Sequence, residues 1–163
     1  MKKIGILSDT HGFTHPSLFE FFKECDEIWH AGDMMNPDIL TDLEAITQVR
    51  AVYGNCDGWD VRSQCKEIEI FEIEKHKVFL KHIIGRPGKY DSSVIDLIRK
   101  EKPTIVVAGH SHILQVKNDT DHGFLFINPG AAGKYGIHNH ITFLRFTING
   151  ANLTQLEVFD QPK

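Results

Sequence analysis

Residues 2–11, KKIGILSDTH, contain the first strand that the sequence predicts and the polar residues that end it. The apolar run from Lys3 to Ser8 is typical of a buried strand. Asp9 and His11 follow this run, two positions apart. In an extended exit from the strand, both side chains would point to the same side and could bind one metal ion. Taken alone the pair is weak evidence, because a capping Asp beside a surface His gives the same sequence.

An alternation of strands and helices continues from this first strand. Helical patterns are expected at Pro16–Glu24 and around Ile39–Leu43, and further strands at Glu27–His30 and Gln48–Tyr53. The order β-α-β-α-β predicts a parallel sheet. Open sheets of this kind gather ligands at the carboxyl ends of their strands, where Asp9 and His11 would lie.

The rest of the chain is richer in strands. Adjacent runs at Lys66–Ile73 and Lys77–Ile83 indicate a hairpin, and a helix at Ser92–Lys100 precedes a buried strand at Thr104–Ala108. Four short strands then predict an antiparallel second sheet. These strands are expected at Leu114–Lys117, Phe124–Ile127, Ile141–Thr147 and Leu153–Phe159.

Length and composition favour one domain over residues 1–163, since 41% hydrophobic residues can build a single core. A net charge of -4 gives no basic surface for sustained nucleic-acid binding or for an anionic membrane. The first apolar run is too short for a signal peptide or a membrane span, so we expect a cytoplasmic protein. The cysteines, Cys25, Cys56 and Cys65, have no C-x-x-C spacing and are expected to be reduced thiols.

Further metal-type side chains stand at the ends of the other predicted strands. They are Asp33 in Gly32-Asp33, Asn55 in Gly54-Asn55, His82, and the two histidines of Gly109-His110-Ser111-His112. Each has a simpler interpretation by itself: a helix cap for Asp33, a left-handed turn for Asn55 and a hydrogen-bonded His for His82. Together with Asp9 and His11 they offer seven oxygen or nitrogen donors, which suits a pair of first-row divalent ions.

The combined order of these motifs resembles the calcineurin-like metallophosphoesterase superfamily, specifically its small bacterial and archaeal branch of phosphodiesterases. Five motifs occur in the order of that family: D-x-H, G-D, G-N-x-D, a lone strand-end His and G-H-x-H. The resemblance runs from Lys3 to Gly130 and includes Asn128-Pro129-Gly130 at its end. It implies a four-layer α/β/β/α sandwich of two mixed sheets, with a dinuclear metal site at the carboxyl ends of the strands.

The resemblance also implies the roles of the seven donors. One ion would be bound by Asp9, His11, Asp33 and His112, and the other by Asp33, Asn55, His82 and His110, so that Asp33 is the bridge. Two divalent metal ions are implied, manganese first, with nickel, iron and zinc as alternatives. Two such ions, two carboxylates and a bridging hydroxide leave a local charge of about +1, which attracts a phosphate anion.

The expected activity is hydrolysis of a small phosphoester, foremost a phosphodiester, by a hydroxide that bridges the two ions. Asn55 and His110 are the expected catalytic contacts to the phosphate, and Asn55, Cys56 and Asp57 the candidates for substrate binding. Two alternatives stay open: a phosphomonoesterase acting on a small phosphorylated metabolite, and a catalytically silent protein-binding scaffold of the same fold, as in eukaryotic membrane-coat complexes. A homo-oligomer is compatible with apolar edges among the late strands.

The chain departs from the family pattern at two positions. Many relatives carry a His after the Asn, where this chain has Cys56, a poor acid for protonating a leaving group. The lone His is usually followed by Gly, whereas two apolar residues separate His82 from Gly85 here.

Other polar residues have two open interpretations each. His30 could orient Asp33 or be a buried hydrogen-bonded His. Lys81, Arg86 and Lys89, near His82, could help to hold a phosphate or be solvated cations. His138 and His140 could touch the substrate or an extra ion, or lie in a solvated turn.

Overall fold

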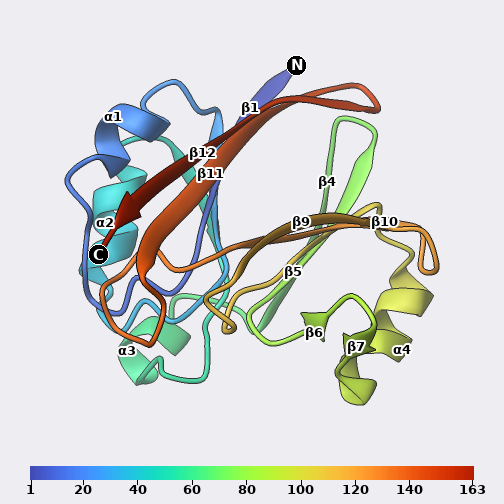
Figure 1. Cartoon of the computed structure of the whole chain (residues 1–163), viewed down its shortest axis with the longest axis horizontal. Coiled ribbons are helices and arrows are strands. Elements are labelled where there is room, and N and C mark those ends of the chain that lie inside the picture. Colours follow the sequence, from blue (N-terminus) through green and yellow to red (C-terminus); the bar gives the residue numbers. More distant parts are fainter.

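The computed structural model describes residues 1–163 and contains two five-stranded mixed sheets (Figure 1). The first sheet has the strand order β12-β11-β1-β2-β3, and the second has the order β4-β5-β8-β10-β9. The strands of the first sheet are β1 (Lys2–Leu7), β2 (Glu27–His30), β3 (Gln48–Ala51), β11 (His140–Asn149) and β12 (Asn152–Pro162). The strands of the second are β4 (Ile68–Ile73), β5 (His76–Lys81), β8 (Ile105–Val107), β9 (Leu114–Asp119) and β10 (Phe124–Pro129).

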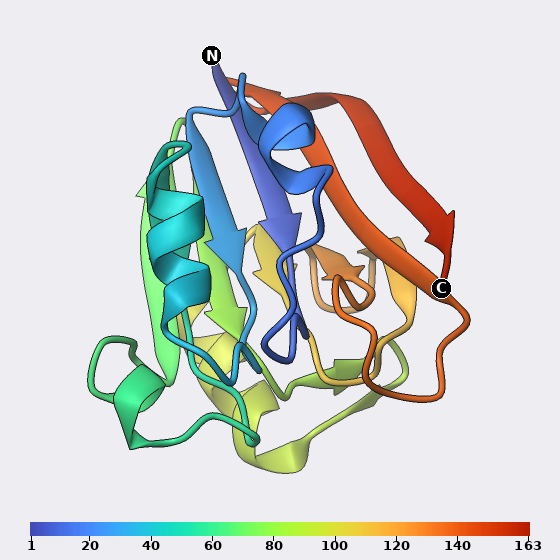
Figure 2. The same ribbon diagram turned by 90° about the vertical axis from the view of Figure 1, so that its left-hand side faces the viewer.

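Helices cover the outer face of each sheet. The helices are α1 (Leu18–Phe22), α2 (Asp38–Glu44), α3 (Trp59–Arg62) and α4 (Ser92–Glu101). Figure 2 shows α1 and α2 in front of the first sheet, where Phe22 and Leu43 pack with Ile28 of β2. On the other side, Val94 and Ile98 of α4 pack against the second sheet. This arrangement confirms the predicted four-layer α/β/β/α sandwich.

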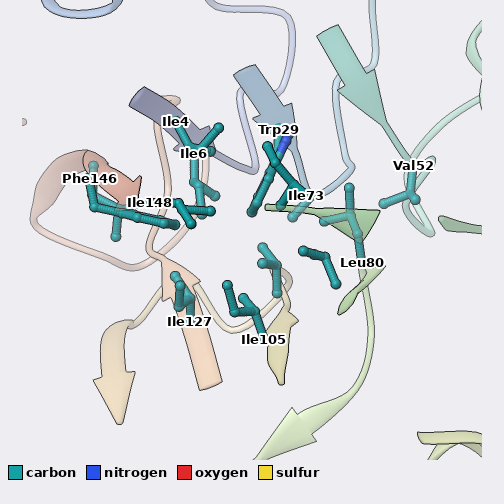
Figure 3. Packing of buried hydrophobic residues seen from close by; sticks show 14 residues of the cluster. Ile4, Ile6, Trp29, Val52, Ile73, Leu80, Ile105, Ile127, Phe146 and Ile148 are labelled. Atoms are coloured by element: carbon teal, nitrogen blue, oxygen red, sulfur yellow. The ribbon is translucent and has the colours of Figure 1, made fainter. Parts of the chain in front are cut away.

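The main hydrophobic core lies between the two sheets. It contains 14 buried residues, and Figure 3 shows side chains from both sheets pointing toward one another. Ile6 and Trp29 come from the first sheet, and Leu80 and Ile105 come from the second; all four are fully buried. Each such side chain stabilises the fold by about 1.5–3 kcal/mol relative to exposure. This layer therefore fixes the position of one sheet against the other.

Parallel pairing brings several strand ends to the same edge of the molecule. β1 pairs in parallel with β2, and β2 with β3, as the alternating pattern predicts. In the second sheet β8 is the parallel neighbour of both β5 and β10. The chain segments that leave β1, β2, β3, β5 and β8 therefore emerge together.

The prediction that the four late strands form one antiparallel sheet is wrong. β11 and β12 join the first sheet, with β11 antiparallel to β1, while β9 and β10 complete the second sheet. The reason is the burial of β11 on both faces: Ile141 and Phe143 pack into the helix layer, whereas Leu144 and Phe146 pack between the sheets. Such a strand needs cover on both sides, and a place beside β1 provides it.

Short elements that the sequence analysis did not predict surround the strand ends. They are helix α3 and a small hairpin of β6 (Gly85–Arg86) and β7 (Lys89–Tyr90). Helix α1 is also shorter than the predicted 16–24. No helix in the structure has the length and apolar character required to span a bilayer.

Candidate metal centre

Six of the seven predicted donors come together at the common edge of the two sheets. Their ligand atoms fall into two groups, and within each group all atoms lie within 4.8 Å of one another. The first group is Asp9, His11 and His112, and the second is Asp33, His82 and His110. The segments after β1, β2, β5 and β8 supply them, so each sheet contributes three of the six.

The first group has the spacing of atoms that share one ion. His112 Nε2 lies 3.1 Å from Asp9 Oδ1, and His11 Nε2 lies 3.4 Å from His112 Nε2 and 3.7 Å from Asp9 Oδ1. Donors that bind one tetrahedral ion at 2.0–2.1 Å are separated by roughly 3.3–3.4 Å. The three side chains need only small adjustments to reach that geometry.

Asp33, a member of the second group, also faces the first group. Its Oδ2 is 3.1 Å from His82 Nε2 and 3.9 Å from His11 Nε2. Its Oδ1 instead accepts a hydrogen bond of 2.8 Å from the backbone N–H of Cys56. Oδ2 is therefore the oxygen that faces both groups.

Two buried polar atoms in the centre have no hydrogen-bond partner. They are Asp9 Oδ1 and His82 Nε2, which lie 3.9 Å apart. The carbonyl oxygen of Ala31 accepts from His82 Nδ1 at 2.7 Å, so Nδ1 carries the hydrogen and Nε2 has a free lone pair when the ring is neutral. Buried atoms without partners are rare, and a cation in each of the two donor groups would satisfy both atoms. The residues present therefore fit a metal ion.

Electrostatics at the centre favours cations. Burial alone would raise the pKa of Asp9, but the neighbouring imidazoles of His11, His112 and His82 outweigh it and hold that pKa well below its usual range. The hydroxyl of Ser8, which donates to Oδ2, acts in the same direction. Burial likewise opposes protonation of His82, yet the nearby carboxylates of Asp33 and Asp9 raise its pKa. Both pKa shifts show that the surroundings favour positive charge at this centre.

The histidine His138 fixes the orientation of His112. Its Nε2 donates to the carbonyl oxygen of Gly133 at 2.9 Å, so its Nδ1 accepts from His112 Nδ1 at 3.0 Å. This leaves the lone pair of His112 on Nε2, which faces Asp9. His138 thus lies behind a candidate ligand, while His140 is paired with Asp160 on the exposed surface. No sequence signal pointed to this contact, because His138 lies 26 residues from His112.

The backbone at the strand exits is left-handed, not extended as predicted. Five of the candidate ligands have positive φ values: Asp9 (55°), His11 (45°), Asp33 (58°), His110 (67°) and His112 (58°). This conformation costs a non-glycine residue about 1–2 kcal/mol, and such costs cluster at functional sites. Here it turns the chain sharply at each strand end, and hydrogen bonds hold the turns: the N–H of His11 donates to the carbonyl of Asp33 at 3.0 Å, and that of His110 to Asp9 Oδ2 at 3.0 Å.

The three candidates for substrate binding lie in different environments. Asn55 is exposed and lines a cavity of about 240 Å³ together with His82, and its Nδ2 is 3.4 Å from Cys56 Sγ. The sulfur of Cys56 lies within 4.8 Å of the ligand atoms of His11 and Asp33. Burial and the neighbouring Asp33 carboxylate raise the pKa of this thiol to about 11, so it is protonated at neutral pH.

Asp57 is buried and supports the backbone of the centre. Its Oδ2 accepts from the N–H groups of Asp33 at 2.9 Å and Gly54 at 2.7 Å, and its Oδ1 accepts from the N–H of Met35 at 2.7 Å. With both oxygens bonded to the protein, the geometry favours a positioning role over contact with the substrate. The G-N-x-D motif contains this residue but does not indicate that role.

Two further features of the exits tighten the packing around the donors. His30 accepts from the N–H of Gly32 at 3.0 Å and lies 3.1 Å from Thr10 Oγ1, and burial lowers its pKa to about 3. It is therefore a neutral buried His that supports the backbone before Asp33. At Gly54 an added Cβ would lie 2.1 Å from Asp33 Oδ1, so only glycine fits.

The fold and the site together define a class of protein, the metallophosphoesterases. Its features are two packed sheets between helices and a group of His and Asp donors, supplied by both sheets, at one edge. The family model of the calcineurin-like phosphoesterase superfamily domain matches residues 1–151, and the chain belongs to that superfamily. A "probable metallophosphoesterase" of Methanothermobacter thermautotrophicus is 32% identical over 133 residues, which cover 78% of this chain and 76% of that protein.

Solved structures show the same fold. A single mutant of Vps29 from Entamoeba histolytica superposes with a TM-score of 0.76 at 21% identity and covers 98% of this chain and 99% of that chain. Wild-type Vps29 from the same organism, complexed with Zn²⁺, gives a TM-score of 0.74 at 18% identity and covers 98% of both chains. At these identities the likeness shows the fold alone.

Proposed function

We propose that the chain is a metal-dependent phosphodiesterase with a dinuclear centre. The observation that carries this proposal is the pair of buried, partnerless donor atoms, Asp9 Oδ1 and His82 Nε2, each within a cluster of three donors. Two bound divalent ions would supply an activated water and neutralise the charge of a phosphate during in-line attack. Membership of the calcineurin-like phosphoesterase superfamily supports the same chemistry.

In this proposal the seven predicted donors hold the two ions. Asp9, His11 and His112 would hold one ion, His82, His110 and Asn55 would hold the other, and Asp33 would be shared between them. Asn55 lies at the rim of the centre and contributes its carboxamide oxygen. Ligands of this mixture suit manganese, with nickel, iron and zinc as alternatives. His110 and Asn55 also contact the phosphate of the substrate.

The environment of Cys56 bears on the choice of substrate. A thiol with a pKa of about 11 is a weak acid, so little protonation of the leaving group is available from this position. We therefore expect esters of acidic alcohols to react fastest. The free thiols of Cys25, Cys56 and Cys65 fit a reducing compartment, and we assign the protein to the cytoplasm on that basis.

Replacing Asp33 with Asn tests the proposal, because it removes one charge from the proposed bridge. Hydrolysis of bis(p-nitrophenyl) phosphate with Mn²⁺ should be lost, together with bound manganese measured by elemental analysis. Asp121→Asn, at an exposed carboxylate, is the control. Full activity of Asp33→Asn would contradict the dinuclear mechanism.

The same assay separates the alternatives. Faster hydrolysis of p-nitrophenyl phosphate than of the bis ester would indicate a phosphomonoesterase. Silence toward both esters with Mn²⁺, Ni²⁺ and Zn²⁺ would favour a protein-binding scaffold, an alternative that the likeness to Vps29 in fold keeps open.

A further inference from the structure

A small hairpin beside the metal centre has a fixed shape. Arg86 and Lys89 are register partners across β6 and β7, joined by Pro87 and Gly88. Pro followed by Gly with φ +85° is typical of a type II turn. At the base, Gly85 has φ +91°, and an added Cβ there would lie 2.5 Å from the carbonyl oxygen of Lys89. The turn sequence therefore builds a rigid hairpin, which lies beside α4 at the lower edge of the molecule in Figure 1.

The hairpin places two positive side chains opposite each other without an acidic partner. Like charges directly opposite on paired strands repel, so Arg86 and Lys89 destabilise the hairpin when nothing lies between them. Neither side chain forms a hydrogen bond or an ion pair with the protein. The other arginines all bind a carboxylate or a backbone carbonyl oxygen; these are Arg50, Arg62, Arg99 and Arg145. Arg86 thus differs from every other arginine in the chain.

Both cations line a cavity that reaches the metal centre. Its volume is about 570 Å³, and His110, a candidate ligand of the second ion, lines it together with Arg86 and Lys89. Ile83 and Tyr90 give it apolar walls. Its one acidic residue, Asp91, accepts from the N–H of Ser93 at 2.9 Å and caps α4. The cavity therefore joins the proposed phosphate position to a pair of free cations.

We propose that Arg86 and Lys89 form an anion subsite that holds a second anionic group of the substrate. The substrate class is then a phosphoester whose unreacted part carries a further phosphate or carboxylate, with a short apolar linker against Ile83 and Tyr90. Arg86 binds the second anion with two N–H donors, and Lys89 adds a point charge. This inference rests on the function proposed above, since it is His110 in the metal centre that defines the other end of the cavity.

Calorimetric titration of the Mn²⁺-loaded protein with two inert probes tests the subsite. Propylphosphonate carries one phosphonate group, and propane-1,3-bisphosphonate carries two, one at each end of the same three-carbon linker. The bisphosphonate should bind roughly ten- to a hundredfold more tightly, as expected for charge-assisted hydrogen bonds. The variant Arg86→Ala/Lys89→Ala should lose that gain and keep the affinity for propylphosphonate. Lys117→Ala, at an exposed lysine on β9, should behave as wild type.

Three results would overturn the inference. The first is equal affinity of the two probes for the wild type, and the second is an unchanged gain in Arg86→Ala/Lys89→Ala. Hydrolysis of bis(p-nitrophenyl) phosphate, followed in the same samples, reports separately on the proposed function. If hydrolysis persists while the probes bind equally, only the subsite is wrong. The third is an absence of hydrolysis, which would remove the substrate inference even if the bisphosphonate bound more tightly.

Discussion

The role of Asp57 leads to a prediction about stability. Replacing Asp57 with Ala removes the acceptor of three backbone N–H groups, those of Asp33, Gly54 and Met35. A hydrogen bond to a charged acceptor contributes about 1.5–3 kcal/mol. If water replaces the acceptor at the exposed Met35 and the other two donors stay unpaired, the free energy of unfolding falls by roughly 3–6 kcal/mol.

A loss of that size is large for a chain of 163 residues. Native domains are stable by about 5–15 kcal/mol, and each kcal/mol corresponds to roughly 2–4 °C in Tm at this length. Asp57→Ala should therefore melt roughly 6–24 °C below the wild type. Because the same N–H groups position Asp33 and the Gly54 turn, the variant should also bind manganese more weakly.

Thermal unfolding of the metal-free protein, followed by circular dichroism, measures the effect, with Asp121→Asn as the exposed control. A substrate contact would act differently: KM for bis(p-nitrophenyl) phosphate would rise while Tm stayed at the wild-type value. A Tm for Asp57→Ala within about 2 °C of the wild type would refute the positioning role.

Three other perturbations have clear expected outcomes. His138→Ala frees the ring of His112 and should weaken manganese binding by roughly ten- to a hundredfold in a metal titration; an unchanged Kd would show that His112 needs no support. Gly54→Ala places a Cβ 2.1 Å from Asp33 Oδ1, so elemental analysis should find less bound metal, and full occupancy would contradict the close approach. Burial lowers the pKa of His30 to about 3, so between pH 6.5 and 3 the unfolded chain binds a proton that the folded chain does not. The free energy of unfolding therefore decreases as the pH is lowered through this range. Between pH 7 and 4.5 this loss is about 2–3 kcal/mol, and urea unfolding of metal-free His30→Asn should lack it; equal losses in both proteins would assign the acid sensitivity to other groups.

The convergence of the donors could be predicted because it follows from local rules. Asp9, Asp33 and His110 each follow a buried strand, and the ends of parallel strands meet at one edge of a sheet. Apolar periodicity likewise predicts the strand at Glu27–His30 and the helix at Ser92–Lys100. The ends of both elements in the structure agree with the prediction within one residue.

The remaining features depend on contacts between distant segments. The place of β11 beside β1 depends on burial of both of its faces, and an apolar run reveals burial but not the neighbour. The left-handed backbone of Asp9 and His11 is imposed by tertiary hydrogen bonds, against the intrinsic preference of both residues. The β6–β7 hairpin is different, because Pro87-Gly88 is a turn signal in the sequence itself and predicts a turn at this position.

The division of the donors between the two sheets has a consequence for the lifetime of the protein. Asp9, His11 and Asp33 leave the first sheet, and His82, His110 and His112 leave the second, so ions bound to these six groups would act as cross-links between the halves of the fold. Ligands that bind only the native state protect it from unfolding by mass action. Metal starvation would then loosen the whole molecule and expose it to proteolysis, and cellular abundance would follow the supply of the ion.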